Sequence, residues 1–221
     1  MLKLPASTAF NKKIPKQKFY TNLQPSSKVV RLFTNQIDTI HWTNKLAPDT
    51  LNLEAGTNVT EIQIIEINLK SEGLDEELIT LIDREIPYHL VFAVRYQGYG
   101  QLWIAYKEDA KNREGKFKVN RYYKTEWLPF EELNLKLEGL NLDQIYEGFL
   151  LQIAGGELTK VEEEDLKTAI DRSNEVEKLN KAIIRLENKI HREKQYNQQV
   201  KLMGDLRKLK LELESLEKRR A

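Results

Sequence analysis

The hydrophobic pattern is most informative over residues 59–70, which read VTEIQIIEINLK. Apolar residues take even positions first, at Ile62 and Ile64, and odd positions afterwards, at Ile65 and Ile67. A strand gives this pattern when its centre is buried on both faces, or when a bulge near Ile64 and Ile65 shifts the register. Because β-branched residues dominate, we predict a strand inside a sheet rather than at its edge.

Apolar residues recur at helical spacing in three other segments. The first has Ser26 as a candidate N-cap and His41 near its end, where His41 is expected to cap or pack. Pro87 stops the second, and Gly155 and Gly156 close the third. The predicted amphipathic helices cover residues 29–42, 74–86 and 140–153.

Two apolar runs, residues 89–96 and 101–107, flank a glycine-containing connector and predict a β-hairpin. The order strand, helix, strand, strand makes the first crossover parallel or mixed, so the class is α+β with a mixed sheet and flanking helices. The remaining segments are a further strand around 121–127, expected at an edge, a short strand over 133–137, and loops over 46–53 and 108–120.

From residue 157 onward the chain has no proline, and its apolar residues follow heptad spacing. A gap of 12 residues separates two heptad runs and does not fit whole heptads. This gap fits either one bent helix or two antiparallel helices that turn near residues 195–197. We favour the helical hairpin because both apolar seams are then buried. The expected oligomer or partner helix residues are Leu179, Ile183, Leu186, Ile190, Leu202, Leu206, Leu209, Leu213 and Leu216.

Length and charge suggest three parts: a basic N-terminal arm (1–25), an α+β domain (26–156) and a helical hairpin or coiled-coil tail (157–221). Residues 1–20 contain five lysines and no acid, interleaved with large apolar residues that favour packing against the domain. Two interpretations stay open for the arm: solvated lysines on a structural segment, or phosphate and base contacts. The candidate nucleic-acid or partner residues are Lys12, Lys13, Lys16 and Lys18.

The chain lacks cysteine, which excludes disulfides and thiolate zinc sites, and none of its apolar runs suits a membrane span. We therefore expect a cytoplasmic protein without cofactors or metals. No nucleotide-binding or hydrolase motif is present. The one catalytic alternative is a divergent Mg-dependent nuclease using Glu61, Glu66 and Asp49, but Glu61-Ile62-Gln63 lacks the lysine that such a core requires.

Several segments, LPASTAFNKKIPKQKFY, KLAPDTLNL and VNRYYKTEW among them, resemble an uncharacterised bacterial and archaeal family known only as a domain of unknown function. Proteins of this kind are often encoded beside helicase-like and DNA methyltransferase genes in restriction or antiphage islands. The resemblance implies an accessory subunit of a DNA-targeting complex and brings no catalytic residues.

We therefore expect a non-catalytic adaptor that binds a protein partner, either a helicase- or methyltransferase-type subunit or a second copy, with nucleic acid as a further partner. The alternatives are the nuclease and a sequence-independent nucleic-acid-binding protein.

Overall fold

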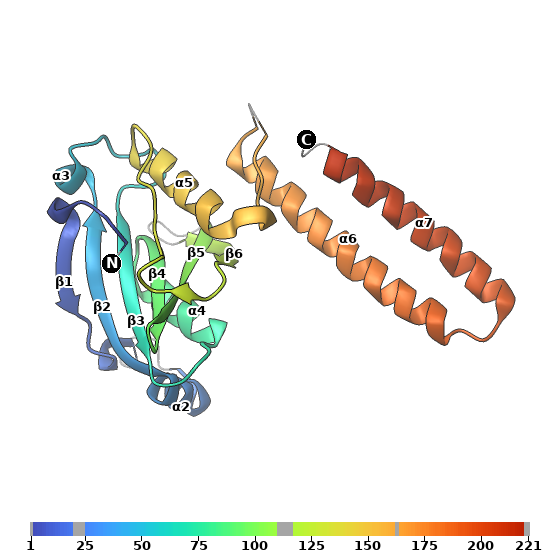
Figure 1. Ribbon diagram of the computed structural model, residues 1–221, viewed down its shortest axis with the longest axis horizontal. Helices are drawn as coiled ribbons and strands as arrows, with labels where there is room; N and C mark the ends of the chain where they lie inside the picture. Colours follow the sequence, from blue (N-terminus) through green and yellow to red (C-terminus); the bar gives the residue numbers. More distant parts are fainter. Residues whose placement is uncertain (1, 20–24, 110–116, 162–163, 219–221) are drawn as a thin grey trace. The chain divides into compact units, whose positions relative to one another are not determined.

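The computed structural model describes residues 2–19, 25–109, 117–161 and 164–218. The chain divides into two compact units, Met1–Ala154 and Gly155–Ala221. The first unit contains a sheet with helices on both faces, and the second contains two long helices (Figure 1).

One mixed sheet organises the first unit. Its strand order is β1-β2-β3-β4-β5-β6, and β7 pairs with β5 beside that path. Strands β3 and β4 run parallel, and the other described pairs are antiparallel. This confirms the predicted α+β class. The strands of the described residues are β1 (Ala9–Lys13), β2 (Ile37–Leu46), β3 (Ile62–Leu69), β4 (His89–Tyr96), β5 (Tyr99–Asp109), β6 (Phe117–Lys124) and β7 (Leu128–Pro129).

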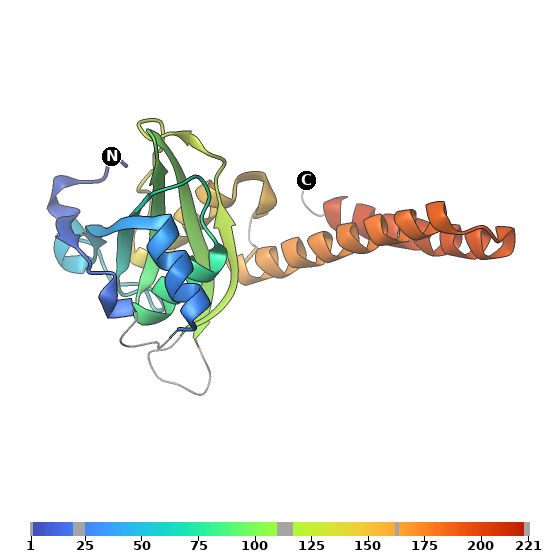
Figure 2. The ribbon, with the colours of Figure 1, turned by 90° about the horizontal axis from the view of Figure 1, so that it is seen from below.

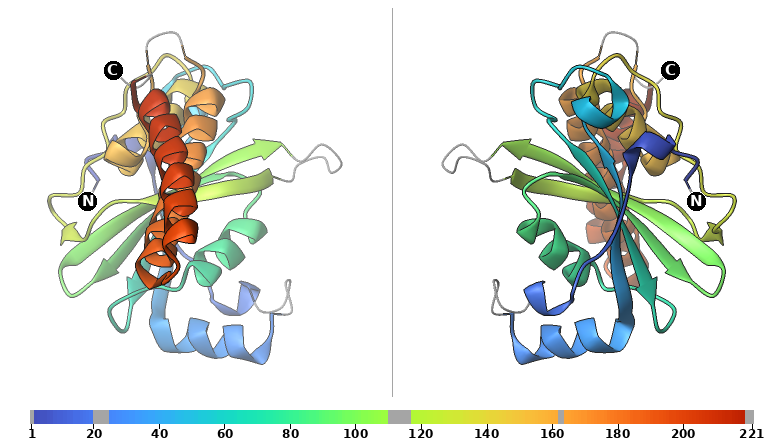
Figure 3. Two further views of the ribbon diagram at one scale, coloured as in Figure 1. Left: turned by 90° about the vertical axis from the view of Figure 1, so that its right-hand side faces the viewer. Right: turned by 90° about the vertical axis from the view of Figure 1, so that its left-hand side faces the viewer.

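Strand β3 is the segment with the switching apolar pattern, and it lies inside the sheet as predicted. Ile65 and Ile67 on one face and Ile62 and Ile64 on the other are all fully buried. β3 pairs with β4 without interruption, so β3 contains no bulge. Of the two interpretations, burial on both faces is correct. Helices α2 (Ser27–Gln36) and α4 (Glu76–Glu85) cover one face, and α5 (Leu142–Ala154) covers the other (Figures 2 and 3).

The first predicted helix is too long. Ser26 caps α2 by accepting a hydrogen bond from the Val29 N–H at 3.4 Å, but residues 37–42 belong to β2. The register of β2 shifts between Ile37 and Thr39, so Ile37 and Ile40 point to the same face although they are three residues apart. A bulged strand therefore imitates the spacing of a helix. Pairing with β3 favours the strand over the helix, because the strand buries both isoleucines completely.

The hairpin of β4 and β5 is confirmed, and its turn is tighter than predicted. Gln97 and Gly98 have φ values of 43° and 85°, the left-handed conformation that a two-residue turn requires. The predicted loop over 108–120 is wrong at both ends, because β5 continues to Asp109 and β6 begins at Phe117. Strand β6 lies at the sheet edge, as expected for 121–127. Residues 110–116 lie outside the described residues.

The predicted strand over 133–137 does not form. Leu133 and Leu135 are instead buried in a segment without regular secondary structure, and Leu133 packs over Gly100 of β5. A Cβ at Gly100 would lie 2.6 Å from Leu133 Cδ1 and from Phe130 Cδ2, so the missing side chain makes room for this segment. The alternating leucines therefore reflect burial, with Leu133 against β5, rather than strand pairing.

Two smaller elements complete the first unit. A short helix, α3 (Pro48–Leu51), occupies part of the loop predicted over 46–53, and a 3-10 turn, η1 (Ala6–Thr8), precedes β1. The carboxylate of Asp143, in the first turn of α5, accepts hydrogen bonds from the N–H groups of Thr57, Asn58 and Val59. These bonds fix the approach to β3.

The second unit is a helical hairpin, which decides between the two interpretations of the tail. It consists of a 3-10 turn η2 (Gly155–Glu157), α6 (Leu166–Arg192) and α7 (Tyr196–Lys218). In the connection, Glu193 Oε1 accepts hydrogen bonds from the N–H groups of Lys194 and Gln195, each at 2.9 Å. The 12-residue gap between the heptad runs therefore spans the turn.

Candidate functional site

A polar cluster lies where β2 and α3 meet the start of β3. Lys45 Nζ lies 3.2 Å from Asp49 Oδ2 and 3.7 Å from Glu61 Oε2. The Asp49 carboxylate, by accepting a hydrogen bond, raises the pKa of Lys45. Gln63 Nε2 donates to Glu61 Oε1 at 2.6 Å, and only 13% of the Glu61 side chain is exposed. Lys45 is paired with Gln63 across the strands, so a neighbouring strand supplies the lysine that the Glu61-Ile62-Gln63 sequence lacks.

Glu66 does not join this cluster. Glu66 lies in β3 three residues after Gln63, so its side chain and that of Gln63, which contacts Glu61, leave opposite faces of the sheet. Glu66 Oε1 accepts a hydrogen bond from Asn68 Nδ2 at 3.0 Å, and its strand partner is His41. His41 therefore lies in a strand, contrary to its predicted place at a helix end.

The structure thus brings together two of the three acids proposed for the nuclease alternative. Within the described part of the chain, no group of three or more His, Cys, Asp or Glu side chains could hold a metal ion.

The N-terminal lysines have different surroundings. Lys16 Nζ donates to the Ile37 carbonyl oxygen at 2.9 Å, and burial lowers its pKa, as does nearby Lys70. Lys12 Nζ lies 4.3 Å from the centre of the Phe10 ring, which itself packs on Trp42. Lys13 and Lys18 are exposed. Of the four lysines, Lys16 therefore has a structural role, and the other three present their charge to solvent.

A buried ion pair that the sequence analysis did not identify joins α4 to β5. Lys107 Nζ lies 2.6 Å from Asp83 Oδ1 and donates to the Tyr88 carbonyl oxygen at 2.8 Å, and both charged side chains are 1% exposed. Tyr122 donates its hydroxyl hydrogen to Asp83 Oδ2 at 2.9 Å. Burial lowers the pKa of Lys107, and the Asp83 carboxylate opposes that change.

A signal for this pair was present in the sequence. Lys107 follows Trp103 by four positions on the same face of β5, and Asp83 follows Ile79 by one helical turn. Both residues therefore lie on the apolar face of their strand or helix, where a buried charged residue needs a partner.

In the second unit, the predicted seam residues face one another across the hairpin. Leu179 and Ile183 are buried, and the other seven are half-buried. Glu187 Oε1 and Lys210 Nζ form a 2.7 Å ion pair between the helices. The heptad residues therefore pack within one hairpin. Even so, none of the residues of α7 is fully buried.

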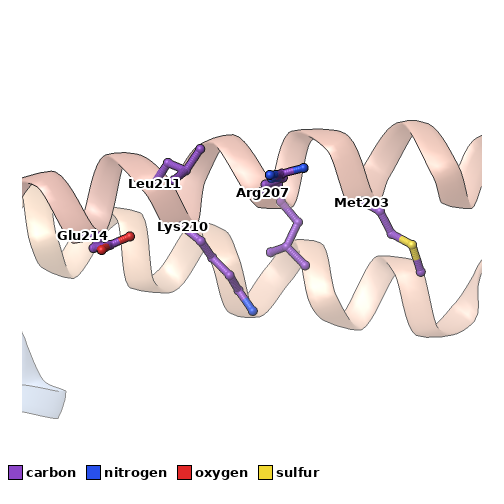
Figure 4. A pocket seen from close by; sticks show the side chains of 6 residues that line it. Met203, Arg207, Lys210, Leu211 and Glu214 are labelled. Atoms are coloured by element: carbon purple, nitrogen blue, oxygen red, sulfur yellow. The ribbon is translucent and has the colours of Figure 1, made fainter.

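Large apolar side chains also lie away from the seam. Their exposed fractions are 57% for Ile184, 50% for Val200, 54% for Met203 and 58% for Leu211. Along α7 a hollow of about 260 Å³ is lined by apolar and charged side chains together (Figure 4). Its lining residues are Met203, Leu206, Arg207, Lys210, Leu211 and Glu214.

Comparison with known proteins identifies one family. A family model described as Domain of unknown function (DUF4391) matches residues 2–213. No curated protein and no solved structure matches the chain. None of the described helices combines the length and the apolar character needed to cross a membrane.

Proposed function

Because the chain belongs to the DUF4391 family, whose model extends over the sheet unit and the helical hairpin alike, we propose one function that uses both units. The protein is a non-catalytic adaptor subunit of a DNA-targeting restriction or antiphage complex. Its hairpin associates with the hairpin of a second copy, and its sheet unit binds a helicase-like subunit. The family resemblance supports the helicase-like partner, and the exposed apolar side chains of the hairpin support the association.

The observation that carries this proposal is an apolar flank formed by Ile184, Val200 and Met203. With Ile183 and Leu206 at heptad position a, Glu187, Met203 and Lys210 take position e, and Ile184 and Val200 take position b. The ion pair between Glu187 and Lys210 puts the e positions of both helices on one side. The neighbouring b positions lie on that side too, so the three apolar residues share one flank of the hairpin.

Two properties of the flank favour a second copy as its occupant. Its charges Glu187 and Lys210 neutralise each other, so these two residues give no net charge that would repel the same flank of a copy related by a two-fold axis. It is also large enough. Helix α7 has 23 residues and is therefore about 35 Å long. A face of two helices about 20 Å wide offers roughly 700 Å², close to the ~800 Å² per partner of a stable interface.

Light scattering after size exclusion tests the association. We expect the full-length protein to elute with about twice the single-chain mass of 25.9 kDa. The double variant Ile184→Asp/Met203→Asp should elute as one chain, because each introduced carboxylate would be buried unpaired at the interface. The matched control is Leu140→Asp, in the sheet unit, where the leucine is 80% exposed. A single-chain mass for the wild type at every attainable concentration would reject the association.

A second candidate function rests on the place of Lys45. A divergent Mg-dependent nuclease needs a lysine beside its carboxylates to stabilise the developing charge, and Lys45 lies within 4 Å of both Asp49 and Glu61.

Glu66 on the opposite face provides a matched control. If the protein cleaves labelled DNA with Mg²⁺ or Mn²⁺, we expect Glu61→Gln to slow cleavage by about 100-fold or more. Glu66→Gln should leave the rate unchanged. Absence of cleavage with either metal, or equal rates in the two variants, rejects the nuclease.

A further inference from the structure

Five basic residues form one stripe along α6. Their successive spacings are 3, 4, 4 and 3 residues, which at 100° per residue confine them to an arc of about 80° on the helix. All five are exposed. This α6 basic stripe consists of Lys178, Lys181, Arg185, Lys189 and Arg192.

The stripe keeps most of its positive charge. Lys178 pairs with Glu175 at 3.3 Å, and Lys181 pairs with Glu177, so the acids gather at one end. Among the described residues, no ion pair involves the other three cations, and Glu187, the single acid in the 178–192 segment, is held by Lys210.

The stripe also lies apart from the apolar flank. Lys178, Arg185 and Arg192 take heptad position c, Lys181 takes f and Lys189 takes g, whereas the flank uses b and e. Binding at one surface therefore leaves the other surface accessible.

The surroundings of the stripe select among anionic ligands. A membrane-binding helix places a broad apolar face beside its cations, but α7 covers the apolar seam of α6, and Ile184 is the one large apolar side chain that α6 exposes among its described residues. Single-stranded nucleic acid binds on stacked aromatic rings, and the stripe contains none. A straight row of cations over 15 residues, about 21 Å at 1.5 Å per residue, matches a regular array of phosphates.

The width of a helix favours DNA over RNA. The major groove of B-form DNA is about 12 Å wide and admits one α-helix, whereas the major groove of A-form RNA is deep and narrow. The exposed side of α6 can therefore lie along a DNA groove with its cations directed at the flanking phosphates. At 3.4 Å per base pair, the stripe covers about six base pairs.

We propose that the α6 basic stripe binds the phosphate backbone of duplex DNA without reading its sequence. The contact adds a direct DNA interaction to the proposed adaptor and does not depend on its self-association.

Fluorescence anisotropy of a labelled DNA duplex over a salt series tests this proposal. The stripe variant is Arg185→Gln/Lys189→Gln/Arg192→Gln in the full-length protein. The control variant Lys28→Gln/Arg31→Gln/Arg84→Gln removes the same charge from exposed positions on α2 and α4. We expect the stripe variant to bind at least about tenfold more weakly at low salt. Its slope of log affinity against log salt should be smaller by about 2.7, since each lost phosphate contact removes ~0.9.

Several outcomes would overturn the assignment. They are wild-type protein that does not bind at low salt, equal weakening in the stripe and control variants, and binding of duplex RNA or anionic vesicles in preference to DNA. A variant neutralised at Lys12, Lys13 and Lys18 should bind almost normally. If it alone loses binding, the N-terminal arm is the DNA site instead. Light scattering on the stripe variant should still give the wild-type mass, which separates this proposal from the self-association.

Discussion

Replacement of Lys107 by methionine is expected to lower the free energy of unfolding by about 3–5 kcal/mol, the usual effect of removing one partner from a buried ion pair. The Asp83 carboxylate, 1% exposed, would lose the ammonium group 2.6 Å away and, among the described residues, keep the Tyr122 hydroxyl as its hydrogen-bond partner. Methionine has nearly the length of lysine, so the loss reflects an unpaired buried charge rather than a large cavity. Urea unfolding at neutral pH, followed by circular dichroism, measures the effect.

Two further variants separate charge from packing. Lys218→Met breaks an ion pair with Glu214 whose side chains are 75% and 56% exposed, and should change stability by less than about 0.5 kcal/mol. Replacing the whole network, with Lys107→Met, Asp83→Leu and Tyr122→Phe together, should recover most of the lost stability because no buried charge then remains unpaired. If Lys107→Met alone costs less than about 1 kcal/mol, the pair does not carry the charge state that its geometry implies.

Acidification is expected to destabilise the protein through His89. Burial lowers the pKa of His89 from 6.5 to about 3, and the positive charge of Lys107 adds to this effect. In the unfolded chain the imidazole takes up a proton near pH 6.5, whereas in the folded chain it stays neutral until about pH 3. The contribution of His89 is therefore complete above pH 6.5 and is lost as the pH falls through that window. At about pH 4.5 the loss is roughly 2.7 kcal/mol, at 1.36 kcal/mol per pH unit.

Comparison of unfolding free energies at about pH 7.5 and pH 4.5 measures this loss, because the two pH values lie on either side of the ordinary histidine pKa. In His89→Phe the loss should be smaller by about the amount assigned to His89, because a neutral ring keeps the contacts with Phe117 and Tyr146, whose centres lie 4.6 Å from the His89 ring. His191→Phe, at an exposed site on α6, should retain the wild-type pH dependence. Equal pH dependence in all three proteins would show that His89 is protonated in the folded state.

The candidate sites were partly predictable. The heptad leucines and isoleucines identified the hairpin because their spacing is local and α-helix geometry fixes which residues share a face. The cluster around Glu61 was not predictable as a cluster. Lys45 reaches Glu61 only through the pairing of β2 with β3, which no local spacing encodes. The buried Lys107 depends in the same way on the packing of α4 over β5.

By itself, the sequence determined the character of individual elements: β3 as an internal strand, the β4–β5 hairpin, helices α4 and α5, and two heptad runs. These follow from apolar periodicity, from proline and glycine positions, and from turn residues, all of which act within a few residues along the chain. Tertiary structure decided where a pattern had two interpretations. Ile37 and Ile40 became part of a bulged strand because β3 offered a partner, and Leu133 packs over Gly100 without strand pairing, at the point where β7 pairs with β5. In both places, long-range pairing and burial outweighed local spacing, because the free energy of removing a large side chain from water exceeds the small difference between local backbone preferences.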